Sequence, residues 1–134
     1  MNPTTIVPDG WTKPVGYAHG MSAGAGRVVV TAGQVGWNPA TAAFESDDFV
    51  EQTAQALRNI VEVLRAAGGR PEHLVRLTWY ILDKDEYMRS RKALGAKYRE
   101  ILGAHFPTMT VVVVSGLLEP RARLEIEATA VVPE

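Results

Sequence analysis

The chain has 134 residues, with 14 Lys and Arg against 15 Asp and Glu, a formal charge of −1 and no cysteine. This length suits one domain with a buried core. The near-neutral charge disfavours nucleic acid and anionic membranes as partners, and without thiols there are no disulfides or Cys-based metal sites. No apolar run reaches the about 18 residues that span a membrane, and the first ten residues lack signal-peptide features. We therefore expect a soluble, cytoplasmic, single-domain protein.

The N-terminal third is expected to hold little regular structure. Residues 1–10 contain two prolines and an Asp-Gly pair, which predict an irregular lead-in. The glycine-rich stretch 16–26 predicts short strand pieces and a turn, and RVVVTA at 27–32 predicts a strand that Gly33 ends or bends. Residues 34–48 include Asn-Pro and several acidic residues, which are typical of a loop.

Regular elements follow in the rest of the chain. Apolar residues recur at helical spacing from Val50 to Leu64, which predicts a helix that begins near Asp48 and ends before Gly68. The further predicted elements are a strand at 74–82 (LVRLTWYIL), a helix at about 86–103, and strands at 109–114 and 123–132.

This order predicts an α+β fold in which one sheet is backed by two helices. The runs 74–82 and 109–114 are apolar at consecutive positions, so both of their faces are expected to be covered. Because two helices cover only one face, we expect the other face to meet a second copy of the chain. The last strand alternates instead, and its apolar residues Leu124, Ile126, Ala128 and Ala130 are expected to face the core.

Common catalytic and binding motifs are largely missing from the sequence. There is no GxGxxG, GxxxxGK[ST] or HExxH. Residues 20–24 fit GxSxG, but a nucleophile elbow needs a strand before it and a helix after it, whereas Ser22 stands in a glycine-rich turn. His19, His73 and His105 have no partners at ligand spacing and are expected to be surface or loop residues. Hydride transfer, phosphoryl transfer and zinc hydrolysis are thus disfavoured.

A series of short motifs resembles the YjgF/Rid family over nearly the whole chain, from about Gly16 to Val132. The family text reads like GPYSQ, SGQ, an AG after the first helix, PAR and EIEA. The matching positions here are Gly16-Tyr17, Thr31-Ala32-Gly33-Gln34, Ala67-Gly68, Pro107 and Glu125-Ile126-Glu127-Ala128. Each match is weak alone, but their conjunction at this length is specific.

The resemblance implies a chorismate-mutase-like fold with a mixed sheet of about six strands. It also implies a homotrimer with ligand clefts between adjacent subunits. Family enzymes hydrolyse reactive enamines or imines derived from amino acids, without metal or organic cofactor. Tyr17 matches the cleft tyrosine of the family, Gly33 the glycine whose backbone lines the site, and Glu125 the glutamate associated with the water. We therefore expect Tyr17 and Glu125 to be catalytic and Gly33 to bind substrate.

The substrate-binding arginine of the family is replaced in this chain. PAR reads Pro107-Thr108-Met109, and methionine has no charge with which to clamp a carboxylate. Arg91, near a family asparagine, is one candidate for the missing cation. Arg121 and Arg123 are others, although Arg123 shares a strand face with Glu125 and is expected to form a surface pair with it worth less than about 1 kcal/mol.

Two loop residues are further candidates for the cleft. Trp37 follows the SGQ-like segment, and His19 stands where the family often has glutamine. Either would reshape the cleft for a larger or flatter ligand.

Two functions remain open from the sequence. One is a Rid-like hydrolytic deaminase with altered substrate choice, acting on a small molecule. The other is a non-catalytic homotrimer that binds a small metabolite in the same clefts. Ribonuclease or translation-inhibitor activity, also described in the family, is disfavoured because the chain has no basic stripe with interleaved aromatics.

Overall fold

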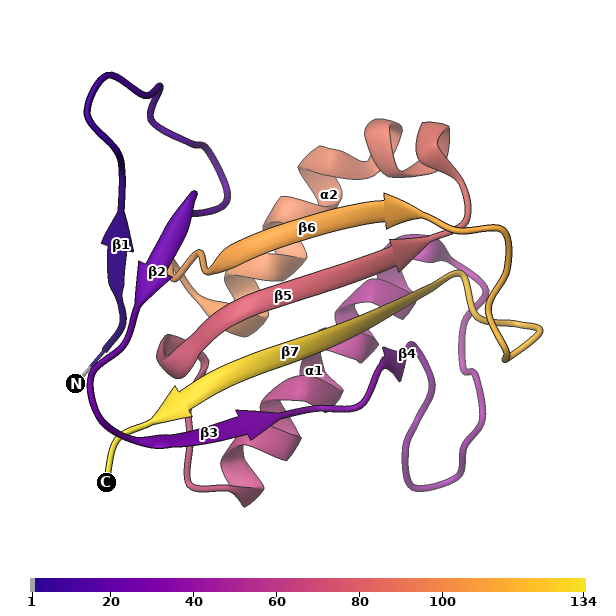
Figure 1. The fold of residues 1–134 in the computed structure, drawn as a ribbon. Helices are drawn as coiled ribbons and strands as arrows, with labels where there is room; N and C mark the ends of the chain where they lie inside the picture. Colours follow the sequence, from indigo (N-terminus) through magenta and orange to yellow (C-terminus); the bar gives the residue numbers. More distant parts are fainter. Residues whose placement is uncertain (1) are drawn as a thin grey trace.

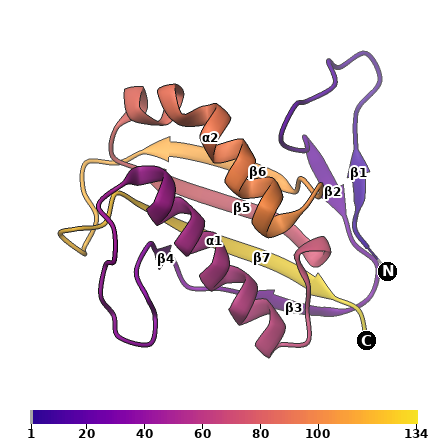
Figure 2. The ribbon, with the colours of Figure 1, turned by 180° about the vertical axis from the view of Figure 1, so that it is seen from behind.

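A five-stranded mixed sheet carries two helices on one of its faces in the computed structural model, which describes residues 2–134 (Figures 1 and 2). The expected α+β class is confirmed. The strands are β3 (Arg27–Val30), β4 (Gln34–Val35), β5 (Leu74–Ile81), β6 (Thr108–Val113) and β7 (Leu124–Val132), and the helices are α1 (Phe49–Ala66) and α2 (Lys84–Leu102). The order is β3-β7-β5-β6, with β4 also on β7, and only the β5–β6 ladder is parallel within this sheet.

Both helices start at aspartate caps. Asp48 accepts a hydrogen bond from the backbone N–H of Glu51 at 2.9 Å, and Asp83 accepts one from the N–H of Glu86 at 3.0 Å. Each side chain satisfies a helix N–H that would otherwise lack an acceptor. The cap at Asp83 places the start of α2 at Lys84, two residues before the predicted start.

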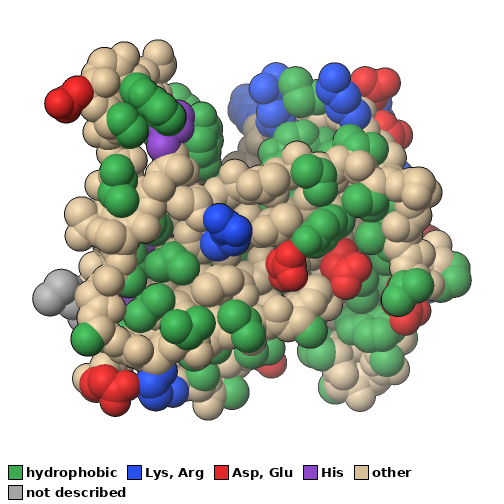
Figure 3. Space-filling model, in the orientation of Figure 1, with side chains coloured by type: hydrophobic (Ala, Val, Ile, Leu, Met, Phe, Trp, Pro, Cys, Tyr) green, Lys and Arg blue, Asp and Glu red, His purple; other side chains and the backbone are tan. Residues whose placement is uncertain are grey.

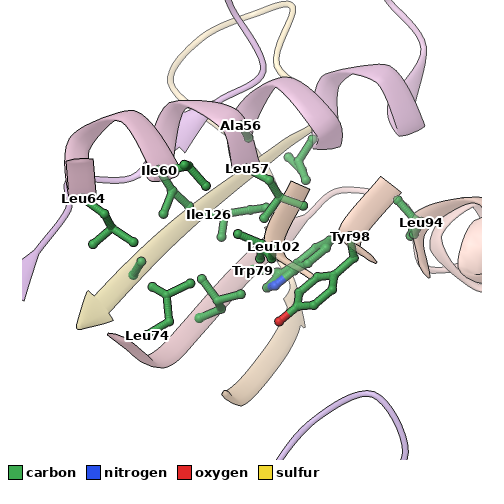
Figure 4. Packing of buried hydrophobic residues seen from close by; sticks show 14 of the residues in the cluster. Ala56, Leu57, Ile60, Leu64, Leu74, Trp79, Leu94, Tyr98, Leu102 and Ile126 are labelled. Carbon is green, nitrogen blue, oxygen red and sulfur yellow. The ribbon is translucent and has the colours of Figure 1, made fainter. Parts of the chain in front are cut away.

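The core lies between the sheet and the two helices (Figure 4). Ile126 and the other apolar residues of β7 named above face it, as the alternating pattern predicted. Trp79 packs edge-to-face on Tyr87, with ring centroids 6.3 Å apart. No helix among the described residues is long and apolar enough to cross a membrane.

The N-terminal segment departs from the prediction of an irregular lead-in. β1 (Thr4–Ile6) pairs antiparallel with β2 (Gly20–Ser22), and the two stand beside the main sheet as a separate hairpin (Figure 1). The prolines at 3 and 8 flank β1 without interrupting it, which explains why composition alone was misleading. β4 likewise lies within a segment predicted to be a loop.

The face of the sheet away from the helices is more polar than the sequence predicted. β5 presents Arg76, Thr78 and Tyr80 there, and basic and acidic side chains stand in the middle of this face in Figure 3. Strand β5 therefore does not have two apolar faces. Its inner positions Leu77 and Trp79 are buried and the alternate ones are not, because successive side chains of a strand point to opposite faces and Arg76, Thr78 and Tyr80 share the outer one.

Candidate functional site

Most of the residues singled out by the sequence fall into two groups, one around Met109 and one around Glu125, and these two residues lie on opposite faces of the sheet. Met109 is opposite Leu77 in the β5–β6 ladder, and both pack with the core on the helix-covered face. Glu125 is opposite Tyr80, three residues further along β5. Residues an odd number of positions apart on a strand point to opposite faces, so Leu77 and Tyr80, and the residues opposite them, lie on different faces of the sheet. The three residues also separate them by ~10 Å along the strand. Met109 and Glu125 of one subunit thus cannot contact the same small ligand.

The first group lines a groove between α2, the outer edge of β6 and the segment before β2, called the α2 groove below. Its volume is about 820 Å³, and Tyr17, Arg91 and Met109 line it together. In Figure 3 the groove opens at the top, between the N-terminal segment that carries β1 and β2 and the Lys and Arg side chains over α2. Its apolar lining includes Trp79, Leu94, Tyr98, Phe106, Met109 and Val111.

Tyr17 and His19 also border a second hollow, of about 570 Å³, that they share with Met109. The two rings meet edge-to-face, with centroids 5.4 Å apart. His19 Nε2 is held 3.0 Å from the carbonyl oxygen of Thr12, while the Tyr17 side chain is half-exposed and makes no hydrogen bond within residues 2–134. Tyr17 is therefore the more available of the two for a ligand.

Three basic residues of the α2 groove were missed by the sequence reasoning. Arg89, Lys92 and Arg99 line it together with Arg91, and all four are exposed at its lip. None of the four forms an ion pair with a described residue. The spacing Arg91, Gly95, Arg99 is the signal that would have found the pattern, because residues four apart are neighbours on a helix surface.

The second group, called the Glu125 cluster, comprises Gly33, Tyr80, Glu125 and Glu127 on the open face. A Cβ on Gly33 would stand 2.7 Å from Cδ of Glu125, so this position must be glycine for the carboxylate to lie where it does. The Glu125 carboxylate makes no hydrogen bond or ion pair with residues 2–134. The Glu125 side chain is half-buried.

Tyr80 and Glu127 were not predicted as site residues. The Tyr80 hydroxyl donates a hydrogen bond to Glu127 Oε1 at 2.5 Å. This bond is the largest of the effects that raise the pKa of Tyr80 above its usual value. Desolvation and the nearby charges of Glu127 and Glu125 raise the pKa of Tyr80 further. Tyr80 therefore stays protonated near neutral pH and fixes Glu127, which leaves Glu125 as the uncommitted carboxylate of the pair.

The other candidates for the missing cation serve structural roles. Arg121 donates to Asp47 Oδ1 at 2.7 Å and its guanidinium lies 5.6 Å from the centre of the Phe44 ring. Arg123 donates to both carboxylate oxygens of Glu86, at 2.7 and 2.6 Å. The predicted pair between Arg123 and Glu125 is thus wrong, because Arg123 reaches α2 instead.

Trp37 lies outside both groups within the subunit. It sits in the loop after β4, where its ring tilts against Phe44 at 5.8 Å, and its carbonyl oxygen accepts a hydrogen bond from Asn59 at 3.0 Å. The prediction that Trp37 shapes a cleft therefore depends on contact with another subunit.

No cluster of three or more His, Asp or Glu suited to a metal ion occurs in residues 2–134. His73 is not the surface residue that was expected: it is buried, and its Nδ1 accepts the backbone N–H of Arg70 at 3.0 Å. His105 Nε2 lies 2.8 Å from the carbonyl oxygen of Leu74. These bonds tie both residues to the fold.

The fold and the motif positions define a member of a known class. The sequence profile of the family described as Endoribonuclease L-PSP, the YjgF/Rid family, matches residues 12–132. The chain therefore belongs to this family.

Individual relatives cover most of its length. A RutC family protein of Pyrococcus horikoshii is 32% identical over 88% of this chain and 89% of its own. A 2-iminobutanoate/2-iminopropanoate deaminase of Capra hircus is 33% identical over 78% of this chain and 73% of its own. The solved structure of YyfB, a Rid family protein of unknown function from Yersinia pestis, has a TM-score of 0.87 at 32% identity and covers 98% of this chain and all 100% of that one.

E. coli TdcF with bound serine is also similar. It has a TM-score of 0.67 at 28% identity, and the match covers 91% of each chain.

Proposed function

We propose that the protein is a hydrolytic deaminase of reactive enamine or imine intermediates with altered substrate choice, acting at clefts between the subunits of a homotrimer. The observation that carries the proposal is the Glu125 carboxylate, which rests against Gly33 and has no partner among the described residues. The deaminase relatives, about 30% identical, support the reaction class.

The separation of the two groups supports an inter-subunit cleft. Tyr17 and Met109 line the α2 groove, and Met109 lies on the helix-covered face of the sheet, whereas Glu125 lies on the open face. In a ring of three copies, the Glu125 cluster of one subunit meets the α2 groove of the next. Each cleft then combines a carboxylate for the water with an apolar wall for the substrate.

The proposed chemistry uses few groups. Glu125 holds a water molecule and accepts one of its protons as the oxygen attacks the electrophilic carbon of the C=N bond. The resulting carbinolamine loses ammonia once its nitrogen takes up a proton, and a carbonyl compound remains. Tyr17, exposed in the α2 groove, is placed to donate a hydrogen bond to the substrate.

The test is imine loss in the presence of the purified protein. An amino acid oxidase generates the imine, and semicarbazide traps what remains. We expect faster loss with the wild type and no acceleration with Glu125→Gln, while Glu62→Gln, an exposed change on α1, behaves as wild type. No acceleration by the wild type across a panel of imines would refute the deaminase, and equal acceleration by Glu125→Gln would refute the role of Glu125.

A second candidate, a non-catalytic metabolite-binding trimer, is favoured by Met109 in place of the arginine. A thermal-shift screen separates the two. A ligand that raises the melting temperature without any imine turnover supports the binding protein, whereas turnover that depends on Glu125 excludes it.

A further inference from the structure

The α2 groove has two chemically distinct parts. Its wall consists of apolar and aromatic side chains, of which Trp79, Leu94 and Tyr98 are buried and Phe106 and Met109 partly so. Its lip carries four basic side chains from α2, and none of the residues that line the groove is acidic. A hydrolytic water site requires neither feature.

The lip has a defined geometry at Gly95. Arg91, Gly95 and Arg99 follow one another at four-residue spacing on one side of α2. The two terminal nitrogens of Arg99 lie 3.7 Å from where a Cβ of Gly95 would stand, so this guanidinium folds back over the glycine. Arg91 Nε donates to the carbonyl oxygen of Met88 at 3.3 Å, which leaves both of its terminal nitrogens without a described partner.

Charge and shape together select the ligand. Forked guanidinium donors match the two oxygens of a carboxylate, and their attraction is stronger beside an apolar wall than in open water. The wall itself accepts flat or branched apolar groups, which bury area against Phe106 and Met109. A short imino acid whose carboxylate is bound at the lip does not reach the apolar wall, so the wall stays uncovered.

We propose that the α2 groove binds amphipathic carboxylates, with an aromatic or bulky aliphatic body against Met109 and Phe106 and the carboxylate on Arg91 and Arg99. This rests on the proposed function and deepens it. The substrates would be imines of amino acids with large apolar side chains, and the anion site would lie on α2 instead of at position 109.

Calorimetric titration tests the site without any turnover. The probes are 3-phenylpropanoate, its neutral analogue 3-phenylpropanamide, and propanoate, each titrated into wild type, Arg91→Gln, Arg99→Gln and the control Arg58→Gln on the exposed side of α1. We expect wild type and Arg58→Gln to bind 3-phenylpropanoate at least about fivefold more tightly than either groove variant. The amide and propanoate should bind more weakly than 3-phenylpropanoate, and added salt should weaken the carboxylate alone.

Three results would overturn the proposal: equal affinity for the acid and the amide, wild-type affinity in both groove variants, or no binding of 3-phenylpropanoate at millimolar concentration. The deaminase is judged separately. Charge-dependent binding without imine hydrolysis refutes the deaminase and leaves the binding site standing. Imine hydrolysis that depends on Glu125, with the same KM for the imine in wild type and Arg91→Gln, refutes the binding site and leaves the deaminase standing.

Discussion

Met109 and Glu125 lie on opposite faces of the sheet, displaced along β5 by the three residues that separate Leu77 from Tyr80. The two positions that the family motifs emphasise are thus divided within a single subunit. The contributions of the α2 groove and of the Glu125 cluster can therefore be measured separately, because a substitution on one face leaves the other face of the same subunit unchanged.

Gly33→Ala should reduce imine hydrolysis while leaving the fold intact. The new Cβ would meet Cδ of Glu125 at 2.7 Å, and the flexible carboxylate side chain has to move away. A displacement of about 1 Å in a catalytic group can cost on the order of 100-fold in rate. Steady-state kinetics and thermal melting measure the two effects. Gly116→Ala, where a Cβ has nothing within 4 Å, is the matched control and should change neither.

Met109→Arg should raise kcat/KM for small imino acids such as 2-iminopropanoate. The guanidinium would enter the α2 groove where the family carries its carboxylate clamp. Stopped-flow measurement of imine loss with small and aromatic substrates gives the comparison. Met109→Leu, which keeps the wall apolar, should leave the preference unchanged; a Met109→Arg protein with a wild-type substrate profile would show that this position does not contact substrate.

Gly95→Ala should stabilise the protein by about 0.5–1 kcal/mol, because glycine within a helix costs this much relative to alanine. The added Cβ makes only ordinary contacts, at 3.7 Å from the Arg99 guanidinium. Urea unfolding followed by circular dichroism measures the change. A loss of stability would mean that the guanidinium of Arg99 cannot adjust to the methyl group.

The ion pair between Arg123 and Glu86 should contribute about 1 kcal/mol of coupling energy. Its geometry is bidentate, but the two side chains are 40% and 20% exposed, so solvent screens the attraction. A double-mutant cycle with Arg123→Gln and Glu86→Gln isolates this energy. If the two single changes are simply additive, the pair adds nothing to stability.

The protein should lose stability as the pH falls below about 6.5, the ordinary pKa of histidine. Burial, and then the charge of Arg70, lower the pKa of His73, whose Nδ1 accepts a hydrogen bond and must stay unprotonated. In that range the unfolded chain binds a proton that the folded chain resists, so unfolding becomes more favourable as pH decreases.

Urea unfolding of wild type at pH 7.5 and 5.5 measures this loss of stability. His73→Gln serves as the comparison, since glutamine does not titrate. The variant should be less stable overall but less sensitive to pH in this window. Equal pH dependence in both proteins would assign the effect to other groups.

The sequence by itself determined the two helices, the strands β3, β5, β6 and β7, and the family. The helical spacing from Val50 to Leu64 and the strict alternation in β7 are local patterns whose outcome depends on neighbouring residues, and the structure confirms them. The motif string likewise identified the YjgF/Rid family, since it needs only residue types in order.

Tertiary structure decided which residues meet. Arg123 pairs with Glu86 and not with Glu125, and this contact spans 37 positions of the chain, which sequence periodicity does not relate. The pairing of β5 with β7 places Arg76 opposite Thr129 and Tyr80 opposite Glu125, on the face of the sheet that the helices leave open. The α2 groove exists only because Gly16 and Tyr17 return to the edge of β6 beside Arg91 and Arg99. Such long-range contacts depend on packing and register, which no local pattern encodes.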